Sequence, residues 1–186
     1  MIIKNFEIKK LEKINLNLIL LYGENEGFKH SIINDFFTKN FDGEVQKYEE
    51  DEVFKNYDEF VSNLLNKSFF SEKKLLVLSR TSEKILKFIE EIITKDLSDI
   101  KIVINSKSLD KKSKLRSFFE KKEECACIPF YEDDEKTLNQ MASSFFTKNK
   151  ISISREMINL IVDRCRGDRQ NLDNELGKIS SLLSTK

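Results

Sequence analysis

The chain has 186 residues, 39% of them hydrophobic and 34% charged, which is the composition of a folded protein with one medium domain or a domain and a small satellite. Lysine and arginine together number 32, as do aspartate and glutamate, so the chain lacks the basic excess of an autonomous DNA-binding domain. Its apolar runs are too short for a membrane span and its first residues lack the layout of a signal peptide, which makes the cytoplasm the expected location.

Expected strands and helices alternate over the first two thirds of the chain. Short apolar or alternating runs predict strands at residues 17–22, 44–48, 75–78, 100–104 and 125–130. Apolar residues at helical spacing predict helices at residues 27–40, 57–65, 82–94 and 113–122. Strands that alternate with helices imply parallel crossovers, so the expected fold class is α/β with a parallel sheet.

The pattern changes after Pro129, the single proline, and the acidic stretch "EDDE" at residues 132–135. Beyond it only helices are expected, at residues 134–148, 154–165 and 168–183, and Gly167 is suited to end the second of them. The sequence therefore predicts an α/β domain over residues 1–135 and a small three-helix domain over residues 136–186.

The three cysteines do not form a metal signature. Cys125 and Cys127 are two residues apart, with no second pair and with the single histidine far away in the sequence. At strand spacing the two side chains share one face, where a thiol behaves as a small hydrophobic group. We expect both to lie in the core, and we expect no metal site.

The stretch "LLYGENEGFKHSII" at residues 20–33 has the outline of a phosphate-binding loop: an apolar strand, a glycine, then a helix. A working loop has Gly, four residues, then Gly-Lys-Ser/Thr. With Gly23 as the first glycine, Lys29 takes the lysine position, but Phe28 replaces the second glycine and His30 replaces the hydroxyl residue. A register that uses Gly27 as the second glycine fits worse. The loop therefore resembles a degenerate P-loop.

The rest of a nucleotide site is also incomplete. Glu24 and Glu26 place carboxylates where a polyphosphate would bind, and the strand "LLVLSR" ends in Ser79 and Arg80 rather than in the acidic residues that hold Mg²⁺ and the attacking water. His30 has no catalytic partner and is expected on a helix surface or in a cap. We expect neither ATP hydrolysis nor a bound cofactor.

Four stretches occur in the order and at about the spacing found in the delta subunit of the bacterial DNA polymerase III clamp loader, a degenerate AAA+ protein. They are "LILLYGENEGF", "NKSFFSEKKLLVLSR", "KIVINSKSLDKKSKLRSFFEK" and "DRCRGDRQNLDNELGKIS". The resemblance implies a P-loop NTPase-like AAA+ domain followed by an all-helical lid domain. It covers the first two of the family's three domains, so a helical collar domain is expected after residue 186 and the chain is expected to be a fragment.

The resemblance also implies a task, which is to bind the ring-shaped sliding clamp and help open it for loading onto primed DNA during replication. The implied partners are the clamp (beta), the gamma/tau and delta-prime subunits, and DNA only within the assembled loader. Ser68, Phe69 and Phe70 match the family's clamp-binding motif, in which a leucine usually stands at the position of Phe69. Adjacent aromatics in the polar stretch "NKSFFSEKK" also fit interface anchors, the alternative being that they pack into this chain's own core.

Other positions separate related functions. Arg169 matches an arginine that contacts nucleotide in active AAA+ proteins; without nucleotide, a structural role is expected, such as an ion pair with Asp173 four residues on. The Ser-Arg-Cys trio of sister subunits is not found before Cys125, which favours delta over gamma or delta-prime. The basic stretch from Lys107 to Arg116 would either contact DNA within a loader or form a solvated helix surface. The competing functions are an ATP-hydrolysing AAA+ enzyme with an atypical P-loop and a nucleic-acid-binding module.

Overall fold

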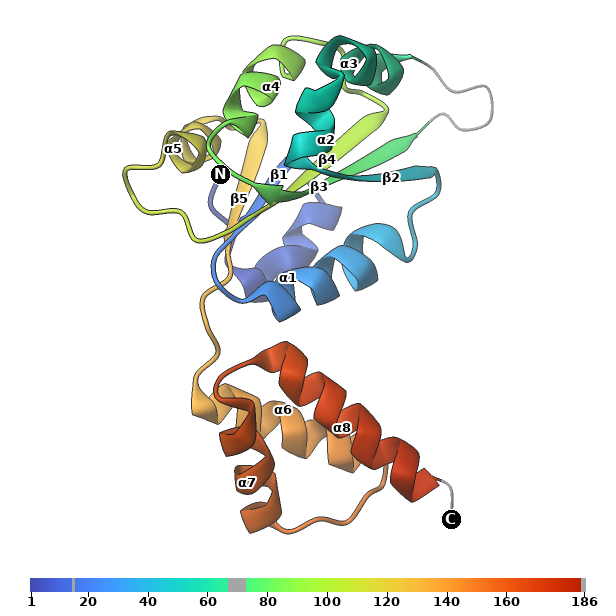
Figure 1. The fold of residues 1–186 in the computed structure, drawn as a ribbon, viewed down its shortest axis with the longest axis vertical. Coiled ribbons are helices and arrows are strands. Elements are labelled where there is room, and N and C mark those ends of the chain that lie inside the picture. The colour runs from blue at the N-terminus through green and yellow to red at the C-terminus, as the bar shows by residue number, and fades with distance from the viewer. Residues whose placement is uncertain (15, 67–72, 185–186) are drawn as a thin grey trace. The chain divides into compact units, whose positions relative to one another are not determined.

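A computed structural model describes residues 1–14, 16–66 and 73–184, and it divides into two compact units. The first unit comprises Met1–Glu24 and Lys29–Phe130, and the second comprises Asn25–Phe28 and Tyr131–Lys186. The short segment Asn25–Phe28 thus belongs to the second unit although it follows the first strand. Figure 1 shows the elements of each unit.

Five parallel strands form one sheet in the described part of the first unit. They are β1 (Leu18–Tyr22), β2 (Glu44–Glu49), β3 (Lys74–Thr81), β4 (Ile100–Ser106) and β5 (Cys125–Pro129). Their order across the sheet is β2-β3-β4-β1-β5, so β1 lies between β4 and β5. The expected α/β class with a parallel sheet is confirmed.

Helices cover both faces of this sheet, as Figure 1 shows. One face carries α2 (Glu50–Lys55), α3 (Tyr57–Leu65), α4 (Ile85–Ile92) and α5 (Lys114–Lys121). On the opposite face lie the 3-10 segment η1 (Asn5–Glu12) and the segment that runs from α1 (Glu26–Ile32) into the π-helical segment η2 (Ile33–Thr38). Coverage on both faces explains why the central strands are continuously apolar.

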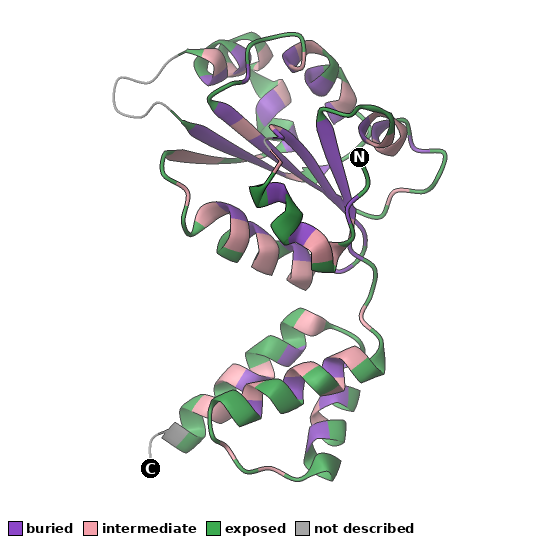
Figure 2. Cartoon of the chain, turned by 180° about the vertical axis from the view of Figure 1, so that it is seen from behind, coloured by how far each residue is buried: buried purple, intermediate pink, exposed green. Residues whose placement is uncertain are grey.

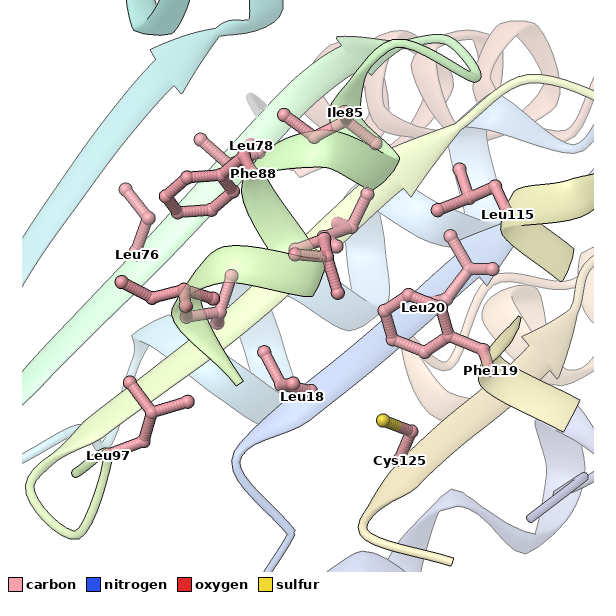
Figure 3. Packing of buried hydrophobic residues seen from close by; sticks show 14 of the residues in the cluster. Leu18, Leu20, Leu76, Leu78, Ile85, Phe88, Leu97, Leu115, Phe119 and Cys125 are labelled. Atoms are coloured by element: carbon pink, nitrogen blue, oxygen red, sulfur yellow. The ribbon is translucent and has the colours of Figure 1, made fainter. Parts of the chain in front are cut away.

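Alternation along the strands divides the core between the two faces. Leu18, Leu20 and Tyr22 of β1 contribute to the core under α2–α5, where the buried rings of Phe88 and Phe119 also lie (Figure 3). Figure 2 shows β1, β3, β4 and β5 largely buried, the edge strand β2 partly exposed, and the outer faces of the helices exposed. Cys125 and Cys127 are fully buried in the same core, which confirms the prediction from their spacing.

The second unit contains α6 (Glu135–Lys148), α7 (Arg155–Cys165) and α8 (Arg169–Ser184). Side-chain caps start all three helices: Asp134 accepts a hydrogen bond from Thr137 N–H, Ser154 accepts one from Met157 N–H, and Asp168 accepts one from Asn171 N–H. After α7 the backbone becomes left-handed at Arg166 and Gly167 (φ 48° and 80°), so Gly167 follows the helix end as predicted. The core of the unit comprises Leu138, Ala142, Phe146, Ile158, Val162, Cys165, Leu172 and Leu176.

Several elements differ from their prediction. The expected helix over residues 27–40 is divided into α1 and η2, and the expected helix over residues 82–94 is regular only over Ile85–Ile92. The segments η1 and α2 were not predicted, because each is short, has charged residues at half or more of its positions, and buries only two side chains. Within the described ranges, the helices are too short or too polar to cross a membrane.

Candidate functional site

Backbone contacts with other segments of the first unit fix the loop that follows β1. Gly23 has φ of 125°, and a Cβ atom built on it would lie 2.1 Å from the carbonyl oxygen of Phe130. Its N–H donates a hydrogen bond of 3.2 Å to the carbonyl of Lys107. A glycine is therefore required here for a close approach of two backbone segments within the first unit, independently of any phosphate.

Lys29, at the position of the P-loop lysine, points into the protein. Its side chain is 0% exposed, and its Nζ donates to the carbonyl oxygens of Gly23 (2.7 Å) and Ser106 (2.6 Å). A P-loop lysine instead extends toward the β- and γ-phosphates of a nucleotide. In this chain the ends of β1 and β4 supply carbonyl acceptors for the ammonium group, so its charge is compensated internally. His30, the next residue, is exposed.

The end of β3 carries a cation where an NTPase would carry carboxylates. Arg80 has a left-handed backbone (φ 55°), and its exposed guanidinium pairs with Glu49 at the end of β2, with a closest N–O distance of 3.0 Å. The nearby Glu50 accepts a 2.7 Å hydrogen bond from the Ser82 hydroxyl and another from the Ser82 N–H, so it caps the turn after β3. Among the residues that the structure describes, no three His, Cys, Asp or Glu side chains gather as a metal site.

A separate polar network occupies the second unit. The Asn25 side chain accepts a hydrogen bond from Phe28 N–H (3.0 Å) and donates to Asp133 (2.6 Å) and to the carbonyl of Tyr131 (3.2 Å). The Arg169 guanidinium donates twice to Asp133, at 2.7 Å from Nε and 2.9 Å from Nη2. It also lies 3.9 Å from the centre of the Phe28 ring, within cation–π range.

This network corrects one prediction and shows a residue that sequence reasoning missed. Arg169 forms its ion pair with Asp133, 36 positions away, and not with Asp173. Partial desolvation raises the pKa of the Asp173 carboxyl; Arg169 opposes this shift and the charge of Asp133 adds to it. Asp133 stands in the acidic stretch that marked the change of pattern, but nothing in that stretch distinguished it from its neighbours.

Two further sequence predictions concern surface contacts. The residues predicted to bind the clamp, Ser68, Phe69 and Phe70, lie outside the described residues, so that prediction stays a prediction. In the basic stretch, the side chains of Lys107, Lys111, Lys112 and Lys114 are exposed. Arg116 instead pairs with Glu120 (2.7 Å) and lies 5.1 Å from the centre of the Tyr22 ring, so this arginine has a structural role within the first unit.

No family model matches the chain. In sequence, it is 24% identical over 174 residues to the probable DNA polymerase III subunit delta of Rickettsia prowazekii (strain Madrid E), an alignment that covers 94% of this chain and 52% of that protein. Among solved structures, the Bacillus subtilis clamp loader delta protein YqeN matches with a TM-score of 0.56 and 18% identity over 96% of this chain and 57% of that one. The chain resembles a clamp-loader delta subunit.

Further solved structures are similar to this chain in fold. The replication initiator DnaA, bound to AMPPCP and single-stranded DNA, matches with a TM-score of 0.60 and 16% identity over 92% of this chain and 58% of that chain. The Holliday junction branch migration motor RuvB of Thermotoga maritima matches with a TM-score of 0.55 and 14% identity over 96% of this chain and 59% of that chain. The parallel sheet and the helical unit thus have the AAA+ type of fold. The chain spans about half the length of the delta relative that it matches.

Proposed function

We propose that this chain is the part of a clamp-loader delta subunit that binds the sliding clamp and helps to open it, without hydrolysing ATP. The sequence likeness to a delta subunit over 94% of the chain supports the loading role. The proposed partners are the clamp, the gamma/tau and delta-prime subunits and, within an assembled loader only, DNA. The proposal treats the protein as a non-catalytic component of the DNA polymerase III holoenzyme.

The observation that carries the non-catalytic part is the burial of Lys29. Its ammonium group is 0% exposed and is hydrogen-bonded to two backbone carbonyls. Turning it toward a phosphate would leave both carbonyls without this donor, at a cost of about 1–3 kcal/mol for each unsatisfied buried group. Arg80 at the end of β3 adds a positive charge where Mg²⁺ would otherwise bind.

ATP binding can be tested by thermal unfolding. A ligand at about 100 times its dissociation constant adds roughly 2.7 kcal/mol to the free energy of unfolding. We expect the melting temperature in millimolar ATP·Mg²⁺ to equal that in matched salt. A clear, saturable rise with ATP would contradict a lost nucleotide site and would favour the ATP-hydrolysing alternative.

The clamp-binding part of the proposal rests on Ser68, Phe69 and Phe70, which stand in the sequence between the end of α3 at Leu65 and the start of β3 at Lys74. Aromatic side chains that enter a partner's pocket commonly dominate an interface, and truncating one typically costs about 2 kcal/mol or more, roughly thirtyfold in affinity. Truncating a core phenylalanine instead costs about 3–5 kcal/mol of folding stability.

The two roles of these phenylalanines separate in one experiment. We would measure affinity for the cognate sliding clamp and thermal unfolding for Phe69→Ala, Phe70→Ala and a control, Phe6→Ala, at a residue that is 75% exposed in the first unit. We expect the first two variants to lose about thirtyfold or more in affinity with little change in melting temperature. The control should keep both properties. Early melting of the first two variants, with clamp binding retained by the folded fraction, would place the pair in the core.

Assembly with the other loader subunits is a separate measurement. By resemblance, assembly belongs to the third domain of the family, and the alignment with the delta relative covers 52% of that protein. We therefore expect these 186 residues to bind the clamp without entering a stable complex with gamma/tau and delta-prime. Size-exclusion chromatography of the mixed subunits tests this. Co-elution of all subunits in one stable peak would show that these residues suffice for assembly.

A further inference from the structure

The Asp133 carboxylate is bound in the way that proteins bind an oxyanion. Its Oδ2 accepts hydrogen bonds from Asn25 Nδ2 (2.6 Å) and Arg169 Nε (2.7 Å), and its Oδ1 accepts one from Arg169 Nη2 (2.9 Å). The two donors of Arg169 form the parallel fork that recognises carboxylate and phosphate groups. Three donors from two separate segments of the second unit thus converge on one anionic group.

The surroundings fix these donors in place. The Asp133 and Arg169 side chains are only 8% and 15% exposed, which strengthens the charged hydrogen bonds between them. The ring of Phe28 packs on the guanidinium at 3.9 Å, and the carbonyl of Tyr131 accepts a second hydrogen bond from the Asn25 amide. The donors are therefore oriented by contacts other than those with the carboxylate.

We propose that Asn25 and Arg169 form an oxyanion site of which Asp133 is the internal ligand. The carboxylate occupies the position that a phosphate or sulfate group would take, and it keeps the site closed to ions from solution. The site accepts a small oxyanion once the Asp133 carboxylate is removed. This inference goes beyond the clamp-loading role and does not depend on it.

A whole nucleotide does not fit the same position. A Cβ atom built on Gly27 would lie 2.8 Å from both the backbone nitrogen and the Cβ of Gln170, so the loop backbone packs directly on the start of α8. The N–H of Phe28, which would face a phosphate in an open loop, is bonded to the Asn25 side chain. We therefore expect ADP to bind no more tightly than inorganic phosphate.

The test is the effect of phosphate on the unfolding of Asp133→Ala. A ligand at ten times its dissociation constant raises the folding equilibrium constant about elevenfold. We expect Asp133→Ala to melt earlier than the original protein in chloride and to regain stability with inorganic phosphate or sulfate at matched ionic strength. The original protein should gain only the small general stabilisation that these salts give to any folded protein, because its site is filled. Asp133→Ala combined with Arg169→Met should lose the response.

A matched control is available in the first unit. Glu120→Ala removes the carboxylate partner of Arg116, another arginine that lies close to an aromatic ring, that of Tyr22. Asp133→Gly, which also removes the carboxylate and leaves its position empty, repeats the test. An equal response in Glu120→Ala or in the original protein, or no response in either Asp133 variant, would overturn the proposal. These outcomes leave the clamp-binding measurement unaffected, because no clamp is present.

Discussion

The ammonium group of Lys29 is shielded from water, so protein atoms take the place of its hydration shell. Its Nζ is bound by carbonyls from the ends of β1 and β4. We expect Lys29→Met to lower the free energy of unfolding by about 1–3 kcal/mol for each carbonyl left unsatisfied. Chemical denaturation measures this change. A variant as stable as the original protein would show that the hydrogen bonds of the Lys29 ammonium group do not stabilise the fold.

Asp173 gives a prediction with a definite sign. Partial desolvation raises the pKa of its carboxyl above the ordinary value of 3.8, although the residue remains exposed, so the folded state binds this proton more tightly than the unfolded state does. The stability from this group is thus present below the ordinary pKa and is lost as pH rises through the raised pKa. We expect Asp173→Asn to be more stable than the original protein at pH 7.

The pH series supplies the control for this variant. As pH falls toward the ordinary pKa of 3.8, Asp173 becomes protonated and resembles asparagine, so the two melting temperatures should converge. If the variant is less stable at pH 7, the attraction between Asp173 and Arg169 outweighs the cost of partial desolvation.

The role of a residue could be predicted from the sequence only where its contact partners are close to it in the chain. The replacements Phe28 and His30 were visible in the loop, but the inward direction of Lys29 depends on Ser106, 77 positions away. Arg169 was assigned the partner that helical spacing supplies at i+4, and its observed partner lies 36 positions earlier. Contacts of this range are set by the packing of elements, which the local pattern does not contain.

At the level of elements, the C-terminus of α3 depends on a buried cation. Lys74 is 6% exposed, and its Nζ donates to the carbonyls of Asn63 (2.9 Å), Leu64 (3.1 Å) and Asn66 (2.5 Å). Carbonyls at a helix end have no partner within the helix, and a positive charge there also favours the helix dipole.

We expect Lys74→Met to reduce the free energy of unfolding by about 1–3 kcal/mol, because buried carbonyls lose their donor. Denaturant titration followed by circular dichroism measures this. Lys73→Met is the adjacent control, since Lys73 is exposed. If both variants lose the same amount, the cap is not the cause.

The predicted elements divide by how much apolar surface they bury. The strands β1, β3 and β4 and the amphipathic helix α4 have continuous or periodic apolar residues, and each was found. Within α2, "EDEVFK", only Glu50 and Val53 are buried, so its periodicity is too weak to detect. The helix break at η2 is a change in backbone hydrogen bonding within one helical pattern, and side-chain spacing does not report it.

On the scale of the whole molecule, the reactivity of the three cysteine thiols can be used to follow the unfolding of the two cores separately. Burial raises the pKa of Cys125 to about 11 and that of Cys127 to about 12, and burial also raises the pKa of Cys165 in the helical unit. Thiolates are the reactive form, so all three should resist alkylation in the native protein.

Labelling in increasing denaturant extends this prediction. The helical unit has the smaller core, so we expect Cys165 to become reactive before Cys125 and Cys127. Mass spectrometry of labelled peptides identifies each site. The replacement Cys165→Ser, which removes the early signal alone, is the control. Simultaneous labelling at all three sites would indicate a single cooperative unfolding of both units.

The close packing around Gly23 limits the replacements that evolution can accept at this position. Its missing side chain makes room for the carbonyl of Phe130, so a chain that stops using nucleotides still cannot replace it. Gly27 is likewise held by the approach of Gln170, whereas the exposed neighbours Glu24 and His30 have no such constraint. Among descendants of such a protein, the glycines of the loop should be kept after the loop has stopped binding phosphate. A glycine-rich signature after a buried strand can therefore be preserved by sterics alone, long after selection for phosphate binding has ended.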